Sequence, residues 1–180
     1  MENEKRTNRN ANMLEWYDAL VFALAFLVLL FTFCARVVSV DGSSMVPTLH
    51  NGDRLVVQSV GYEAKRGDVV VIDSYISYGK PLVKRVVAIG GDTLDIDFAT
   101  GDVILNGQVL DEPYIAERTH LAGDVKFPLT VPQGKVFVMG DNRQHSTDSR
   151  STSVGFIDER DVLGRVLWRL FPLQQIGRIK

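Results

Sequence analysis

An uncharged apolar run near the N-terminus, Ala19 to Ala35 (ALVFALAFLVLLFTFCA), constrains the fold more than any other feature of this 180-residue chain. A helix rises about 1.5 Å per residue, so the run spans roughly 25 Å, close to the shortest length that crosses a bilayer. Trp16 and Tyr17 stand where aromatic side chains favour the membrane interface. Arg36 can snorkel, which lets the two following valines extend the apolar length. The run predicts a transmembrane helix over residues 16–38.

Two other interpretations fit this run less well. A buried core helix would carry a polar stripe, and a cleavable signal peptide would have a shorter apolar region and a small-x-small exit, which FTFCARVV does not offer. Lys5, Arg6 and Arg9 precede the run, and the positive-inside tendency therefore places the N-terminus in the cytoplasm. We expect a single-pass cell-membrane protein held in the lipid bilayer. It would have a cytoplasmic tail (1–15), an anchor (16–38) and an extracytoplasmic domain (39–180).

The chain after residue 40 has the pattern of short strands rather than helices. Its apolar runs are rich in Val, Ile and Leu and are separated by Gly-Asp, Asn-Gly or Pro-Gln-Gly turns: RLVVQ, DVVVID, PLVKRVVAIG, DTLDID, DVILNGQVL and GKVFVMGD. Asn106-Gly107 is a strong signal for a two-residue hairpin. We therefore predict a mainly β, antiparallel, sheet-rich domain. The last stretch, VLGRVLWRLFPLQQIGRIK, is either a final strand or a surface that rests on lipid headgroups.

Composition excludes several classes of function. The net charge of −2 and the pI of about 5.9 argue against nucleic-acid binding. The chain has one cysteine, Cys34, so it forms no intramolecular disulfide. His50, His120 and His145 are scattered and no CxxC or HExxH spacing is present, so we expect no metal site.

The segment DGSSMVPTLHNGD, residues 41–53, places two serines in a turn-rich stretch. A serine hydroxyl needs a nearby base to become a nucleophile. In the strand LVKRVV, Lys84 lies between Leu82 and Val86 on one face, and desolvation there would lower its pKa and favour the neutral amine. The pattern alone favours another interpretation, a snorkelling or ion-paired lysine at a sheet edge. The polar loop GDNRQHSTDSR offers a competing base, because His145 and Asp148 allow a Ser-His-Asp site with Ser44.

Four segments, in order, resemble the sequence motifs of the type I signal peptidase family in its short Gram-positive form with a single anchor. They are GSSMVPTLHNGDRLVV, GDVVVID, LVKRVVAIGGD and GDNRQHSTDSR, and the usual GF and VLGRV follow them. The resemblance covers nearly the whole chain. It implies a serine endopeptidase that removes signal peptides from secretory preproteins, with no cofactor.

The resemblance also implies roles for individual residues. Ser44, which directly precedes Met45, resembles the nucleophile, and Lys84 resembles the general base. Ser146 resembles the serine that orients this lysine. Asp148 and Arg150 resemble the supporting charge pair near the site. The Ser44 N–H would be one donor of the oxyanion hole.

Three features depart from the commonest family pattern. Gly42 stands where some members carry a serine that donates to the oxyanion, so a second donor must come from the backbone or be absent. Gln144-His145 replaces Asp-Asn before Ser146. Aliphatic side chains occupy positions 82 and 83, where an aromatic is frequent. We expect the substrate pocket to be lined by Val40, Leu49, Leu82 and Val83, and to accept small residues at the −1 and −3 positions of an extended peptide.

Two alternatives come from other functional classes. One is a membrane-anchored, inactive relative that acts as a peptide-binding module. The other is a self-cleaving Ser-Lys peptidase similar to LexA repressor. Such regulators are soluble and carry a helical DNA-binding domain where this chain has its apolar run.

Overall fold

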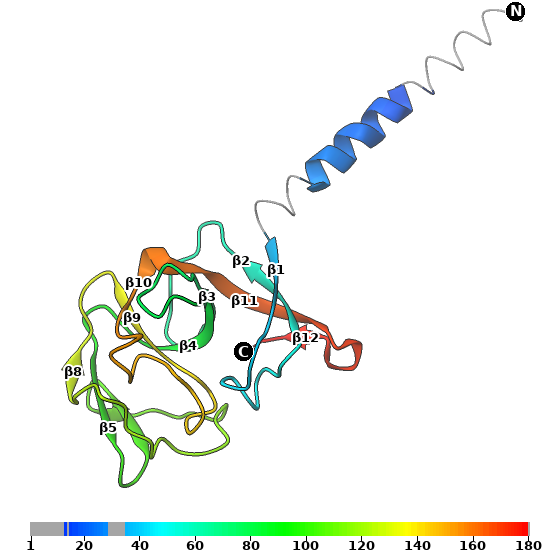
Figure 1. The fold of residues 1–180 in the computed structure, drawn as a ribbon. Coiled ribbons are helices and arrows are strands. Elements are labelled where there is room, and N and C mark those ends of the chain that lie inside the picture. Colours follow the sequence, from blue (N-terminus) through cyan, green and yellow to red (C-terminus); the bar gives the residue numbers. More distant parts are fainter. Residues whose placement is uncertain (1–12, 14, 29–34, 180) are drawn as a thin grey trace, which may run out of the picture.

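The N-terminal region of the computed structural model is only partly described. The described residues are 13, 15–28 and 35–179, and residues 15–28 form an exposed helix that lies apart from the strands (Figure 1). No helix within these ranges has the length and apolar character of a membrane span. Residues 29–34 of the predicted anchor lie outside the described residues.

The end of the predicted anchor is corrected by the structure. Residues 35–38 belong to the first strand, β1 (Ala35–Ser39), which pairs antiparallel with β2 (Arg54–Gln58). Val37 lies opposite Val56 and Val38 opposite Leu55. β-Branched residues favour such a paired strand, so the described sheet begins at residue 35 rather than at residue 39.

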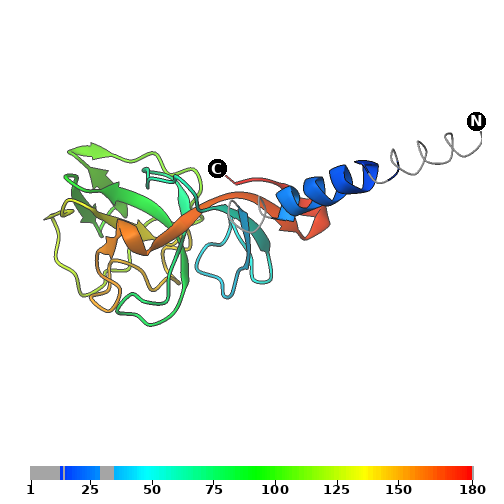
Figure 2. The same ribbon diagram turned by 90° about the horizontal axis from the view of Figure 1, so that it is seen from above.

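The larger sheet carries the predicted runs of strand type in antiparallel pairing. In the described chain it has eight strands in the order β1-β2-β11-β3-β4-β9-β10, and β12 pairs with β11. The further members are β3 (Val69–Ile72), β4 (Leu82–Ile89), β9 (Lys135–Met139), β10 (Ile157–Asp158), β11 (Val162–Phe171) and β12 (Gly177–Arg178). Short 3-10 helices lie at Glu159–Asp161 and Leu173–Gln175. The C-terminal stretch is therefore a strand and hairpin, and β11 runs through the length of the β body (Figures 1 and 2).

A smaller sheet lies at the far end of the molecule from the helix (Figure 1). It is ordered β7-β6-β5-β8 among the described residues and consists of β5 (Thr93–Asp97), β6 (Asp102–Leu105), β7 (Gln108–Val109) and β8 (Leu129–Thr130). The predicted hairpin is confirmed: Leu105 pairs with Gln108, and the two turn residues, Asn106 and Gly107, have φ of 51° and 80°. Positive φ at both positions is what a type I′ turn requires.

Three apolar clusters stabilise this arrangement. β2 shows the alternation of a half-buried strand, with Leu55 and Val57 in the core. β4 is different, because it lies between β3 and β9 and its residues 84–88 are all buried. The prediction that this strand is covered on both faces is confirmed. β4 therefore carries charged side chains into the interior of the protein.

Candidate active site

Residues 41–53, which contain Ser43 and Ser44, form a compact loop between β1 and β2, called here the serine loop. Backbone hydrogen bonds close its base, from the N–H of Val40 to the carbonyl of Asp53 and from the N–H of Gly52 to the carbonyl of Val40. Met45 is fully buried in the first core cluster, and this packing anchors the loop to the core. Ser44, one residue earlier, is thereby held half-buried at the surface of the cleft.

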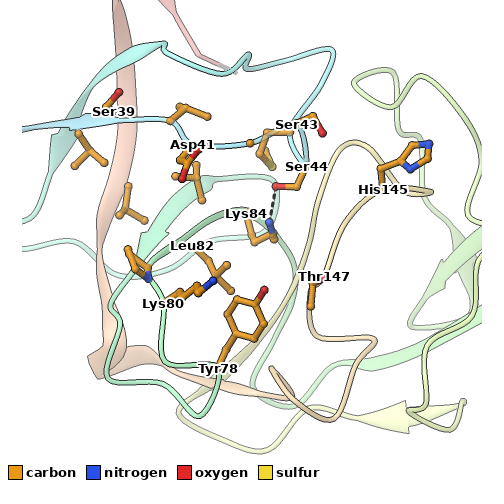
Figure 3. Close-up of a pocket in the computed structure, with 17 residues that line it drawn as sticks. Ser39, Asp41, Ser43, Ser44, Tyr78, Lys80, Leu82, Lys84, His145 and Thr147 are labelled. Atoms are coloured by element: carbon orange, nitrogen blue, oxygen red, sulfur yellow. Dashed lines mark hydrogen bonds between the residues drawn. The ribbon is translucent and has the colours of Figure 1, made fainter.

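Lys84 reaches this serine from β4. Its Nζ and the Ser44 Oγ lie 2.6 Å apart and form a hydrogen bond (Figure 3). Lys84 is 3% exposed, and this burial lowers its pKa from 10.5 to about 8. Arg150 acts in the same direction, whereas Asp148 and Asp141 oppose it. The alternative of a solvated lysine at a sheet edge is wrong, because the strand is internal.

This geometry places a proton acceptor beside a hydroxyl group. A pKa near 8 leaves a useful fraction of Lys84 neutral near pH 7, and the neutral amine has a lone pair for the Ser44 proton. Because the two atoms are already at hydrogen-bond distance, the transfer needs no rearrangement of the strand. A serine and a desolvated lysine in this relation have the chemistry of a nucleophile with its general base.

The structure does not form the competing Ser-His-Asp site. His145 is exposed and its ring points away from Ser44 (Figure 3). No hydrogen bond joins His145 to Ser44 or to Asp148. Both Asp148 oxygens instead accept from Arg150, at 2.9 Å from Nε and from one terminal nitrogen, and one of them also accepts the Gly140 N–H. A histidine without its carboxylate lacks the partner that would orient it.

Asp148 and Arg150 do form the predicted charge pair, and both are buried. Burial raises the pKa of Asp148, but the hydrogen bonds and charge of Arg150 outweigh this, so the pKa lies below its ordinary value. Arg150 also donates to the carbonyls of Leu121 and Arg143. The pair therefore fixes the loop that follows β9.

The hydrogen bond between Ser146 and Lys84 that the family resemblance implies is not formed. The Ser146 Oγ is buried without a hydrogen bond of normal geometry, and it lies near enough to Asp148 to help lower the pKa of that carboxyl. It packs against Gly140, where a β-carbon would overlap both the Ser146 hydroxyl and the Ser44 carbonyl. Lys84 is oriented by its hydrogen bond to Ser44.

A cleft of about 380 Å³ runs past Ser44 and Lys84. Val40, Leu82 and Val83 line it, as predicted. Leu49 does not: it is fully buried in the first core cluster, and its N–H donates to the carbonyl of Met45, so the loop turns its side chain inward. Gly42 also borders the cleft, but its N–H donates to Asn51 Oδ1 at 2.9 Å. That N–H is therefore unavailable to an oxyanion.

Sequence reasoning missed a buried bridge behind the cleft. The Arg85 guanidinium donates to both oxygens of Asp141, at 2.8 and 2.7 Å, and lies 3.9 Å from the centre of the Tyr114 ring. Asp141 also accepts the hydroxyl of Thr48 from the serine loop. The available signal was Arg85 itself, because an arginine in a strand covered on both faces needs a buried partner.

Asn142 is a second residue that sequence reasoning missed. Its backbone N–H donates to the Ser44 carbonyl at 3.0 Å, and its side-chain Nδ2 donates to the Ser43 carbonyl at 3.1 Å. No local pattern indicated that this amide would face the serine loop. Among the described residues, no cluster of three His, Cys, Asp or Glu side chains is placed to hold a metal ion.

Comparison with known proteins identifies the family to which this chain belongs. A sequence profile described as signal peptidase, peptidase S26, matches residues 13–171. The chain is 40% identical to signal peptidase I of Bacillus licheniformis, over 99% of both chains. It is 37% identical to signal peptidase I T of Bacillus subtilis (strain 168), over the full length of both. A crystal structure of a signal peptidase I from Enterococcus faecalis V583 is 28% identical, with a TM-score of 0.47, and the match covers 58% of this chain and 97% of that one. The chain belongs to the signal peptidase family, peptidase S26.

Proposed function

We propose that this protein is a membrane-bound serine endopeptidase that removes N-terminal signal peptides from secreted preproteins. The observation that carries the proposal is the hydrogen bond between Ser44 and a buried Lys84 whose pKa is lowered to about 8. The family membership of the whole chain supports the same conclusion and does not favour a self-cleaving regulator or an inactive binding module.

The catalytic cycle follows from these two side chains. Neutral Lys84 takes the Ser44 proton as the Oγ attacks the scissile carbonyl, and the Ser44 N–H donates to the oxyanion that forms. The Lys84 ammonium then gives its proton to the leaving amine, and the mature protein departs. In the second half, Lys84 activates the water that hydrolyses the acyl-enzyme and releases the signal peptide. One backbone donor of this kind is worth about 3 kcal/mol in other enzymes.

The cleft suits an extended peptide with small side chains. Val40, Leu82 and Val83, all aliphatic, are among the residues that line it. An extended substrate turns alternate side chains toward the same wall, so the residues at −1 and −3 would meet the same apolar surface. These aliphatic walls favour alanine-sized groups there.

We further propose that an N-terminal anchor holds the catalytic domain at the membrane. The proposed layout is a cytoplasmic tail over 1–15, an anchor from residue 16, and an extracytoplasmic peptidase domain that starts with β1. The β11–β12 hairpin lies at the same end of the molecule as the helix (Figure 2). Its exposed apolar side chains support contact with lipid: Trp168, Leu170, Phe171, Leu173 and Ile176. Such confinement raises the effective concentration of membrane-bound preproteins.

Cleavage of a model preprotein tests the proposal. The detergent-solubilised protein is incubated with the preprotein beside Ser44→Ala, Lys84→Ala and His145→Ala, and the products are mapped by mass spectrometry. We expect one cut after a small-x-small site that is lost in the first two variants and kept in the third. Loss of activity in His145→Ala with retention in Lys84→Ala would reverse the assignment of the base. Absence of any cut by the folded wild-type protein on several preproteins would reject the proposal.

A further inference from the structure

Asn142 holds the peptide groups on both sides of the Ser44 α-carbon. Its backbone N–H donates to the carbonyl of Ser44, and its carboxamide Nδ2 donates to the carbonyl of Ser43. The Ser43 carbonyl receives one further hydrogen bond, a longer one of 3.2 Å from the Val46 N–H. Asn142 lies 98 residues from Ser44 and reaches it because the loop after β9 docks against the serine loop.

The second of these hydrogen bonds fixes the direction of a catalytic N–H. The Ser43–Ser44 peptide bond is trans, since the cis bonds of the described chain lie before prolines elsewhere. In a trans peptide the C=O and N–H vectors point in opposite directions. Holding the Ser43 oxygen on Asn142 therefore turns the Ser44 N–H to the other side. The residue before Ser43 is Gly42, at φ +98°, which gives this segment little stiffness of its own.

We propose that the Asn142 carboxamide is a positioning residue that orients the Ser44 N–H as the oxyanion donor. The inference rests on the proposed peptidase function. Without the carboxamide, the Ser43–Ser44 peptide plane keeps only the Val46 hydrogen bond and can rotate. The nucleophile and its base remain in place, because the Lys84–Ser44 hydrogen bond involves neither atom of that peptide group. Asn142 acts on the stability of the oxyanion rather than on proton transfer.

Steady-state kinetics of the full-length protein in detergent test this role, with Asn142→Ala and the isosteric Asn142→Asp. We expect kcat on a model preprotein to fall by about 10- to 100-fold while KM stays within about twofold, since a lost oxyanion donor costs about 10²- to 10³-fold in other enzymes. A peptide aldehyde with alanine at its −1 and −3 positions forms a tetrahedral adduct with the serine. Its affinity should fall by the same factor as kcat, and in Asn142→Ala, which adds no charge, the midpoint of the pH–rate profile should not move.

Asn106→Ala is the matched control. It removes the same group from a hairpin in the smaller sheet, where the carboxamide donates to Asp92, and should leave kcat unchanged. Asn142 variants that keep kcat within about threefold, or that lose kcat without losing aldehyde affinity, overturn the inference and leave the proposed function intact. A moved pH midpoint in Asn142→Ala also overturns it, because Lys84 would then be the group disturbed. An inactive wild-type protein instead overturns the proposed function on which the inference rests.

Discussion

Replacement of Lys84 by methionine should make the protein more stable while it abolishes catalysis. The side chain is 3% exposed, so its ammonium is buried in the interior of the protein and has lost most of its hydration. Desolvation penalises the charged form, which is why the pKa falls from 10.5 to about 8. At pH 7 the folded protein still carries mostly the ammonium, so it bears the penalty. Methionine has a similar length and no charge to desolvate.

The fall in pKa sets the size of the effect. At about 1.4 kcal/mol for each pKa unit, it corresponds to about 3 kcal/mol of free energy. The variant also loses the hydrogen bond to Ser44, which is worth about 1 kcal/mol. We therefore expect Lys84→Met to raise the free energy of unfolding by about 2 kcal/mol at pH 7.

The gain in the free energy of unfolding of Lys84→Met should decrease as the pH rises. Between pH 8 and 10.5 the unfolded wild-type chain binds a proton at Lys84 that the folded chain does not, so wild-type stability rises across this window. The variant lacks this group, and its advantage should be full below pH 8 and gone near pH 10.5. Urea unfolding of both proteins in the same detergent, at pH 6.5 and at 10.5, measures the difference. A variant that is less stable at pH 6.5, or an advantage that grows with pH, would refute this account of the buried lysine.

Three further predictions concern the charges around the site. Because Lys84 must be neutral to accept the serine proton, kcat/KM should rise about tenfold per pH unit up to about pH 8 and then level off, and a profile flat from pH 6 to 9 would contradict this. Arg150→Gln leaves the Asp148 carboxylate unpaired beside the lysine, so the midpoint of that pH–rate profile should move to higher pH, whereas an unmoved midpoint would deny the coupling. Asp141→Ala leaves the buried guanidinium of Arg85 without its carboxylate partner, so urea unfolding should show that the free energy of unfolding falls by about 3–5 kcal/mol. A fall of less than about 1 kcal/mol would show that the ion pair is dispensable.

Many strands of the sheet could be predicted because the residues that favour a strand, and the turns that end it, are neighbours in the sequence. β-Branched runs bounded by Gly-Asp and Asn-Gly turns fix where strands begin and end, and Arg54–Gln58 and the hairpin at Asn106 were confirmed. The order of strands was not accessible in this way. β11 pairs with β2 on one side and with β3 on the other, although both lie at least 90 residues earlier in the chain. The pairing has two register shifts against β2 and one against β3. Such pairing depends on the whole core rather than on any one segment.

The same difference between local and non-local information applies to the candidate site. The period of two in the strand of Lys84 indicated that both faces were covered, but periodicity alone also allowed a snorkelling or ion-paired lysine, and the structure shows that Lys84 is buried. Leu49 was misplaced because a loop has no period from which the direction of a side chain can be inferred. The expected hydrogen bond from Ser146 to Lys84 is not formed, because the direction of a hydroxyl depends on rotation about one bond and on local packing, here against Gly140.

Two adjacent basic residues of β4 show how the fold separates a structural charge from a reactive one. Arg85 is buried with a bidentate carboxylate partner, Asp141, which pairs its guanidinium. Lys84 is buried to a similar degree, but none of the ion pairs among the described residues includes it. The strongest acidic influence on the Lys84 pKa comes from Asp148, which is paired with Arg150, and the charge of Arg150 opposes that of the carboxylate at Lys84. The supporting charge pair therefore offsets part of the stabilisation that Asp148 gives the ammonium, and desolvation remains the largest influence on the lysine pKa.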